Sequence, residues 1–240
     1  MRQTTGGSGM NTDNPNLYKS SIFDDKKLLH AFTTRTSGNM QDKKNRRAAC
    51  ESLGIKYENL VVPEQKHTDN IKIITRPDED VSECDGLITA IPDIGLMLLF
   101  ADCVPVIMYA PDKHVLAVVH AGWRGTAKSI TVKAVDVMEK EFNADPQNIQ
   151  AAIGSAIGQC CYPVSTEVAD QLLCTVIQKD NLLKDTNIDL KMLNARQLTE
   201  RGMLNIDVSG VCTSCENATF YSYRAESGKA GRHAALACLV

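Results

Sequence analysis

The sequence of 240 residues is poor in aromatic side chains and carries almost no net charge. Aromatic residues make up 5% of the chain, with a single tryptophan, and the formal net charge is -3. A chain without an excess of basic residues has no general electrostatic attraction to nucleic acid or to an anionic membrane. These deficits favour a small-molecule partner over nucleic acid or a membrane.

Long apolar runs are also missing. The first twenty residues lack the apolar segment of a signal peptide, and no run elsewhere is long enough to cross a bilayer. The nine cysteines are odd in number, and Cys160 and Cys161 are adjacent, which suits a disulfide framework poorly and is typical of a reducing compartment. We therefore expect a cytoplasmic protein.

The distribution of residue types predicts one folded domain. No linker rich in Pro, Gly and Ser divides the chain, no internal repeat is present, and 43% hydrophobic residues are ample for a full core. Residues 1–21 are polar, so we expect a mobile tail followed by a single domain over residues 22–240. Strand-like and helix-like segments mix without strict alternation, which indicates an α/β or α+β fold with a mixed β-sheet.

The strongest local pattern lies in residues 96–125. Residues 96–110 are nearly all aliphatic apart from Asp102 and Cys103, which predicts one strand buried on both faces. The β-branched run from Val115 to His120 stops at the sequence AGWRG, so His120 is expected at a strand end. Functional side chains are often carried by the loops at such ends.

Three residues in and before this segment are candidate metal ligands: His67, Cys103 and His120. Two imidazoles and one thiolate suit zinc, with a fourth position open for water or substrate. The spacing between them matches no compact zinc finger, so the fold would have to bring them together. The alternatives are a buried cysteine that acts as a small hydrophobe and histidines that form ordinary hydrogen bonds.

Several short segments resemble those of a known family. In chain order they are HAFTTR, EQKHTD, ECDGLIT, ADCVPV, VVHAGWRG, AIGQCCYPV, CTSC, FYSYR and GKAGRHAALACL. This series resembles the YfiH-type family, also called laccase-domain or multicopper polyphenol oxidase-like proteins and now described as purine nucleoside phosphorylases. The resemblance covers about residues 28–240. It implies a fold similar to the cytotoxic necrotizing factor deamidases and a zinc site made by His67, Cys103 and His120.

The resemblance also implies two activities. One is phosphorolysis of adenosine, inosine and 5'-methylthioadenosine, and the other is hydrolytic deamination of adenosine. Phosphorolysis requires phosphate to be held against the anomeric carbon, and arginine is the natural clamp. The arginines within the matching segments are Arg35, Arg124, Arg224 and Arg232; a structural ion pair is the alternative interpretation of each.

Other polar residues near these segments are candidates for contact with substrate. Deamination needs a metal-activated hydroxide and a group that moves protons, which Asp85 or Glu64 could supply. Asp85 could equally be a turn residue. Gln65 is a candidate hydrogen-bond donor to substrate. Asp102 is expected to anchor a polar network, and Trp123 to stack on a purine or to pack internally.

Two other enzyme classes remain open. A copper-dependent (Cu²⁺) polyphenol oxidase would need several histidine-rich sites, for which five histidines are too few. A hydrolase or amidase, linked to peptidoglycan editing, would use Cys103 as a nucleophile activated by His120. A binding module without catalysis is the weakest interpretation, because it gives a metal-ligating residue in a buried strand no purpose.

Two further features stand apart from the predicted site. Cys212 and Cys215 form a lone CxxC that, with the Cys160–Cys161 pair, could make a four-thiolate zinc site. The lack of a second CxxC instead favours ordinary thiols. The family's long Gly-rich insert after its FTTR segment is shortened here to residues 36–41, which makes the substrate range and the role of Arg35 harder to infer.

Overall fold

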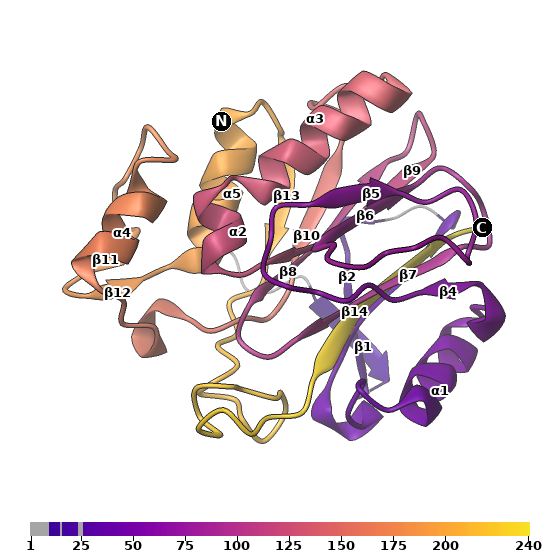
Figure 1. The fold of residues 1–240 in the computed structure, drawn as a ribbon, viewed down its shortest axis with the longest axis horizontal. Coiled ribbons are helices and arrows are strands. Elements are labelled where there is room, and N and C mark those ends of the chain that lie inside the picture. Colours follow the sequence, from indigo (N-terminus) through magenta and orange to yellow (C-terminus); the bar gives the residue numbers. More distant parts are fainter. Residues whose placement is uncertain (1–9, 15, 24–25) are drawn as a thin grey trace.

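The computed structural model describes residues 10–14, 16–23 and 26–240, which form two mixed β-sheets packed face to face (Figure 1). The first sheet has the strand order β1, β2, β3, β14, β7, β4. Its strands are β1 (Met10–Asn14), β2 (Leu17–Ser20), β3 (Leu28–Thr33), β14 (His233–Leu239), β7 (Gly95–Phe100) and β4 (Leu60–Val61). Only β4 runs parallel to its neighbour among these described strands.

The second sheet has the order β13, β10, β8, β9, β6, β5. Its strands are β13 (Asn205–Val208), β10 (Gln150–Ile153), β8 (Val104–Ala110), β9 (Val115–Ala121), β6 (Gly86–Thr89) and β5 (Ile71–Ile73). The two outer pairs, β13 with β10 and β5 with β6, are parallel, whereas the inner pairs are antiparallel. The expectation of an α/β fold with mixed sheets is confirmed.

Helices cover the outer faces of both sheets. They are α1 (Lys43–Leu53), α2 (Trp123–Ala127), α3 (Ile130–Phe142), α4 (Thr166–Leu173) and α5 (Leu190–Glu200), with the 3-10 turns η1 (Arg35–Ser37), η2 (Tyr57–Asn59) and η3 (Gln159–Cys161) and the ribbon β11 (Leu183–Lys184) with β12 (Asn187–Ile188). Helix α1 packs on the first sheet, and α3 and α5 pack on the second. No helix in the described part of the chain is long and apolar enough to cross a membrane.

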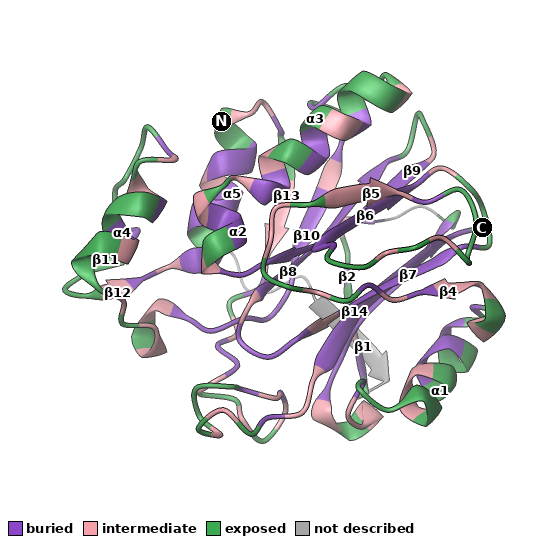
Figure 2. Cartoon of the chain, viewed as in Figure 1, coloured by how far each residue is buried: buried purple, intermediate pink, exposed green. Residues whose placement is uncertain are grey.

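This layering explains why β8 and β9 are apolar throughout. Every residue of these two strands is buried, because one face packs against the first sheet and the other against the helices (Figure 2). A strand covered on both sides loses the alternation of apolar and polar residues that marks a half-exposed strand. The continuous apolar runs in the sequence therefore report a position at the centre of the molecule.

The structure corrects the predicted single strand over residues 96–110. This run forms two strands, β7 in the first sheet and β8 in the second, and residues 101–103 cross between them. Asp102 has a positive φ of 83°, which ends the extended conformation. Because both strands are buried, apolar periodicity alone does not reveal that the chain changes sheets here.

The predicted N-terminal tail is too long. Residues 17–20 form β2, which pairs with β3, and Leu17 is buried in the core. Residues 10–14 add β1 at the edge. Residues 1–9 of the predicted tail lie outside the described residues. Near the other end, residues 220–223 form a loop and residues 233–239 form the strand β14.

Candidate active site

His67, Cys103 and His120 converge although they come from three separate elements. His67 lies in the loop between β4 and β5, Cys103 on the crossing from β7 to β8, and His120 near the end of β9. Their ligand atoms all lie within 4.8 Å of one another, and Cys103 Sγ is 3.8 Å from His67 Nε2. Ligands of one tetrahedral zinc are about 3.3–3.8 Å apart, given Zn–N and Zn–S bonds of about 2.0–2.3 Å. Small side-chain shifts would bring the three atoms to that spacing.

Asp85 holds both histidines in place. Its buried carboxylate accepts a hydrogen bond from His120 Nδ1 at 2.7 Å, which leaves His120 Nε2 as the acceptor for a metal. The same carboxylate accepts hydrogen bonds from the backbone N–H groups of Lys66, His67 and Thr68 and from the Thr68 hydroxyl. Asp85 therefore orients one histidine directly and fixes the backbone that carries the other.

The charges of this cluster suit a divalent cation. Burial would raise the pKa of Asp85, but its hydrogen bond to His120, the charge of His120 and the Thr68 donors outweigh burial and lower that pKa to about 2. Burial would also raise the pKa of Cys103, but His120 and His67 lower it below the ordinary value. Cys103 therefore forms a thiolate readily, which is the form that binds a metal.

Gly122 leaves space for the three ligands. A Cβ at this position would lie 3.0 Å from His67 Cδ2 and 3.1 Å from Cys103 Sγ. These contacts are too close for a side chain to be added without displacing the ligands. The glycine of the AGWRG segment thus allows the backbone before α2 to pass beside the cluster, and the donor set of two imidazoles and one thiolate fits zinc.

Asp102 serves a network beside the cluster, as its position suggested. Its Oδ1 accepts a hydrogen bond from Thr213 Oγ1 at 2.7 Å, and its Oδ2 accepts one from the backbone N–H of Arg224 at 2.7 Å. These two bonds tie the sheet crossing to the loops after β13 and before β14. The carboxylate of Asp102 therefore fixes the strand end that carries Cys103.

The three candidate ligands face a cavity of about 670 Å³. Ligand pockets are typically about 300–1,000 Å³, so this cavity has room for a nucleoside and a phosphate. Its lining includes all three candidate ligands together with Gln41, Pro63, Glu64, Gln65, Leu99, Ala101, Asp102, Trp123, Arg124, Ile157, Tyr162, Tyr223, Arg224 and Arg232. The short loop of residues 36–41 reaches this cavity through Gln41.

Comparison with known proteins gives this site a context. The family described as "Multi-copper polyphenol oxidoreductase laccase" matches residues 30–240. The chain belongs to that family. The sequence is 38% identical to "Purine nucleoside phosphorylase YlmD" of Geobacillus stearothermophilus over 205 residues, which cover 78% of this chain and 75% of the relative.

One further relative and one solved structure extend the comparison. "Adenosine deaminase RL5" from an unknown prokaryotic organism is 32% identical, over 75% of each chain. The crystal structure of YlmD from Geobacillus stearothermophilus superposes with a TM-score of 0.90 at 32% identity and covers 97% of this chain and 99% of that one. The resemblance to the family that the motifs predicted is confirmed, and the fold matches that of the YlmD structure.

The four predicted arginines do not share one location. Arg124, Arg224 and Arg232 line the cavity, and Arg35 does not. Arg35 instead donates to Glu226 Oε1 at 2.6 Å and to the carbonyl oxygens of Asn217 and Phe220. The structure thus places the predicted substrate residue Arg35 outside the cavity lining, where its guanidinium holds together the loop of residues 217–226.

The three arginines of the cavity differ in how many donors they have to offer. Arg232 Nη1 already donates to the carbonyl oxygens of Ala230 and Gly231. Arg224 makes one long hydrogen bond, from Nη1 to Cys161 O at 3.4 Å. Arg124 is exposed, and its guanidinium lies 4.4 Å from the centre of the Trp123 ring. Among the described residues that line the cavity, Arg124 and Arg224 therefore keep the most guanidinium N–H groups out of protein hydrogen bonds.

Gln65 and Glu64 have different surroundings. The Gln65 amide is paired with the backbone of β7: its Nε2 donates to Leu99 O at 2.9 Å and its Oε1 accepts from Leu99 N at 2.7 Å. Gln65 thus anchors the loop that carries His67, and we do not retain it as a substrate donor. Glu64 is exposed at the cavity and pairs with Lys66.

Two aromatic residues of the cavity were not predicted from the sequence. Tyr162 and Tyr223 lie in segments that resemble the family, CCYPV and FYSYR, but their chemistry did not single them out. Burial raises the pKa of Tyr162 to about 12, so its phenol stays a neutral hydrogen-bonding group. Tyr223 is 55% exposed, which leaves its ring accessible to a ligand.

Proposed function

We propose that the protein is a zinc-dependent purine nucleoside phosphorylase that acts on adenosine, inosine and 5'-methylthioadenosine and also deaminates adenosine. The main support is the convergence of His67, Cys103 and His120 on a cavity large enough for a nucleoside and bordered by arginines. Relatives named as purine nucleoside phosphorylases and as an adenosine deaminase agree with this proposal.

His67 Nε2, Cys103 Sγ and His120 Nε2 would hold the zinc ion. When bound, zinc supplies a Lewis acid that polarises a substrate oxygen or lowers the pKa of a water molecule. The chain itself contributes orientation, because Asp85 fixes the imidazole of His120 and the backbone at His67. The low pKa of Asp85 keeps it ionised at neutral pH, so it acts as an orienting acceptor and not as a proton shuttle.

The arginines of the cavity are suited to hold the phosphate nucleophile. Arg124 enters from the first turn of α2 and Arg224 from the loop before β14, so the two guanidinium groups reach the cavity from different elements. Paired hydrogen bonds from guanidinium to phosphate oxygens fix the direction of attack on the anomeric carbon. Their positive charge also matches the phosphate dianion.

The aromatic side chains at the cavity are suited to hold the purine. Trp123 and Tyr223 both line it, and a planar base can stack on either ring. For deamination, Glu64 is the remaining carboxylate candidate. Asp102 accepts hydrogen bonds from Thr213 and Arg224, and Asp85 is buried outside the cavity lining, where it holds His120.

The test is phosphate-dependent release of base. Purified protein is incubated with adenosine, inosine or 5'-methylthioadenosine, with and without phosphate. The free base and the sugar 1-phosphate are measured; the latter is ribose 1-phosphate from adenosine or inosine and 5-methylthioribose 1-phosphate from 5'-methylthioadenosine. The proposal requires both products to appear together and only with phosphate. Release of base without phosphate would indicate hydrolysis, and no release from any of the three nucleosides would refute the proposal.

A second candidate is a cysteine hydrolase, favoured by the 3.8 Å approach of Cys103 Sγ to His67 Nε2 and by the lowered pKa of Cys103. Two imidazoles at one thiol exceed what such a nucleophile needs, so metal binding explains the cluster better. Trapping of Cys103 by an electrophilic substrate analogue in metal-free, active protein would favour the hydrolase. The copper oxidase is weaker, because among the described residues only one ligand cluster contains histidine.

A further inference from the structure

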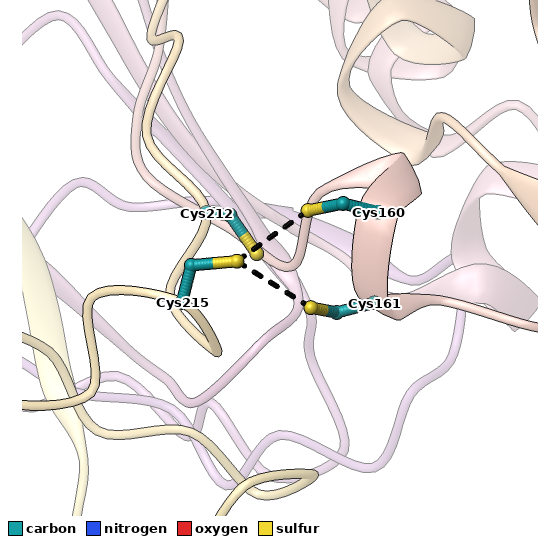
Figure 3. Close-up of side chains that lie close together, drawn as sticks. All are labelled: Cys160, Cys161, Cys212 and Cys215. Carbon is teal, nitrogen blue, oxygen red and sulfur yellow. Dashed lines mark hydrogen bonds between the residues drawn. The ribbon is translucent and has the colours of Figure 1, made fainter.

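Four cysteines gather at a second place in the molecule (Figure 3). Cys160 and Cys161 lie in η3, in the loop that follows β10, and Cys212 and Cys215 lie in the turn that follows β13. Because β10 and β13 are parallel neighbours, their carboxyl ends meet at the same edge of the sheet. The pairing continues beyond the strands through a bridge between Ala156 and Cys212, which draws the two loops together.

The spacing of the four sulfur atoms suits one tetrahedral metal ion. All four lie within 4.8 Å of one another, and Cys215 Sγ is 3.6 Å from Cys160 Sγ and 3.5 Å from Cys161 Sγ. Four thiolates at Zn–S distances of about 2.3 Å would be about 3.8 Å apart. A disulfide requires about 2.05 Å, so no pair of them is bonded in this arrangement.

The surroundings of the Cys212 sulfur also favour a thiolate. The backbone N–H of Gly158 donates to Cys212 Sγ at 3.1 Å. A Cβ on Gly158 would lie 3.0 Å from Cys212 Cβ and 3.3 Å from Cys160 Sγ, so glycine is what permits this approach. Buried Lys191 donates to the carbonyl oxygens of Ser209 and Val211, which fixes the turn and brings a positive charge near the cluster.

We propose that one zinc ion binds in a closed four-thiolate site made by Cys160, Cys161, Cys212 and Cys215. Four protein ligands leave no position for substrate, so this ion is structural. The missing second CxxC is supplied by the adjacent pair Cys160–Cys161, which comes from a neighbouring loop of the same sheet edge. The sequence-based preference for ordinary thiols rested on spacing along the chain, which does not show this proximity.

The four-thiolate site would stabilise one wall of the cavity. Tyr162, which directly follows Cys161, lines that cavity. Thr213, between Cys212 and Cys215, donates to Asp102 beside the candidate ligand Cys103. A metal ion that joins the two cysteine loops would therefore hold the crossing from β7 to β8 and the aromatic wall in register.

Metal counting on the intact protein tests the proposal independently of nucleoside turnover. The protein is purified under reducing, anaerobic conditions, loaded with zinc and desalted, and zinc per chain is measured by mass spectrometry. We expect two ions in the wild type, one in Cys215→Ser, one in Cys103→Ala and two in Cys174→Ser. Cys174 is the matched control, because it is also exposed but lies outside the cluster.

Cobalt substitution reports directly on the thiolate ligands. Wild type and Cys103→Ala loaded with Co²⁺ should both show intense sulfur-to-cobalt charge-transfer absorption, because each keeps four thiolates on one ion. This absorption should fall sharply in Cys215→Ser and persist in Cys174→Ser.

Two results would overturn the proposal. One is zinc content and cobalt absorption that are the same in Cys215→Ser and in wild type. The other is a disulfide within the cluster in reduced, freshly purified protein, detected by thiol counting after denaturation. Absence of phosphorolysis bears only on the pocket and leaves the expected metal counts unchanged.

Discussion

The two clusters of potential metal ligands differ in what surrounds them. The pocket cluster combines two imidazoles with one thiolate, has Asp85 behind it and faces a cavity. The cysteine cluster has four sulfurs on two neighbouring loops and a backbone N–H donor (Figure 3). A site with three ligands and an open side can do chemistry, whereas four ligands close the site. The comparison teaches that ligand number and access, more than ligand type, distinguish the proposed roles.

Ligand substitution should separate the two clusters most strongly. Replacing Cys103 by Ala should lower kcat/KM for phosphorolysis more than about a hundredfold, since even residues behind metal ligands contribute about 10- to 100-fold. Replacing Cys215 by Ala should leave most turnover and lower the melting temperature by at least about 2 °C, the shift expected for about 1 kcal/mol. Kinetics and thermal unfolding check both. If the two variants behaved alike, the division of roles would fail.

Two glycines allow the same comparison without removing any ligand. The Gly122→Ala Cβ would press on His67 and Cys103, so metal affinity of the pocket and activity should fall about 10- to 100-fold. Gly158→Ala should instead weaken metal binding at the cysteine cluster. Gly210→Ala is the control, because nothing lies within 4 Å of its Cβ position. Competition with a chromophoric chelator measures affinity, and a normal pocket in Gly122→Ala would contradict the steric account.

Arg124 and Arg35 should differ in whether their loss affects phosphate binding or stability. Arg124→Met should raise KM for phosphate roughly ten- to hundredfold, as expected for loss of charged hydrogen bonds of about 1.5–3 kcal/mol. Arg35→Met should destabilise the fold by about 1–3 kcal/mol, because it loses its contacts to Glu226 and two carbonyls, and should leave KM for phosphate unchanged. Phosphate titration and urea unfolding measure these quantities. An unchanged KM in Arg124→Met would remove Arg124 from the proposed phosphate contacts.

The smallest effect concerns the segment just after His67. Hydrogen bonds from Lys133 and Lys128 lower the pKa of Asp69 to about 2. Because the folded pKa lies below the unfolded value of about 3.9, this stabilisation is present above about pH 4 and is lost as pH falls toward 2. Asp69→Asn should lower the free energy of unfolding of metal-free protein at pH 7 by at most about 1 kcal/mol, measured as a drop in melting temperature. The difference from wild type should shrink as the pH falls from 4 and disappear below about pH 2; a constant difference would contradict the pairing.

Much of the fold and site could be predicted from the sequence where local pattern and burial agree. The apolar runs of β8 and β9 follow from composition and from burial of these strands on both faces. The three pocket ligands stood out because polar residues beside buried strands need a purpose, and the family motifs contain the same residues. These features are local, so the sequence carries them directly.

The remainder depends on contacts between distant parts of the chain. Apolar pattern reports burial but not which sheet a strand joins, so the crossing at Asp102 was hidden. The cysteine cluster depends on parallel pairing of β10 with β13, which no spacing along the chain reveals. The exclusion of Arg35 from the cavity follows from its partners in the loop of residues 217–226.

The central claim is that the pocket cluster holds the metal on which turnover depends. Its most direct test removes metal with a chelator and then adds zinc back while phosphate-dependent release of base from inosine and adenosine is measured. We predict that release falls to background in the metal-free protein, returns with added zinc in wild type, and does not return in Cys103→Ala. Full turnover by protein verified to be free of metal would contradict the claim.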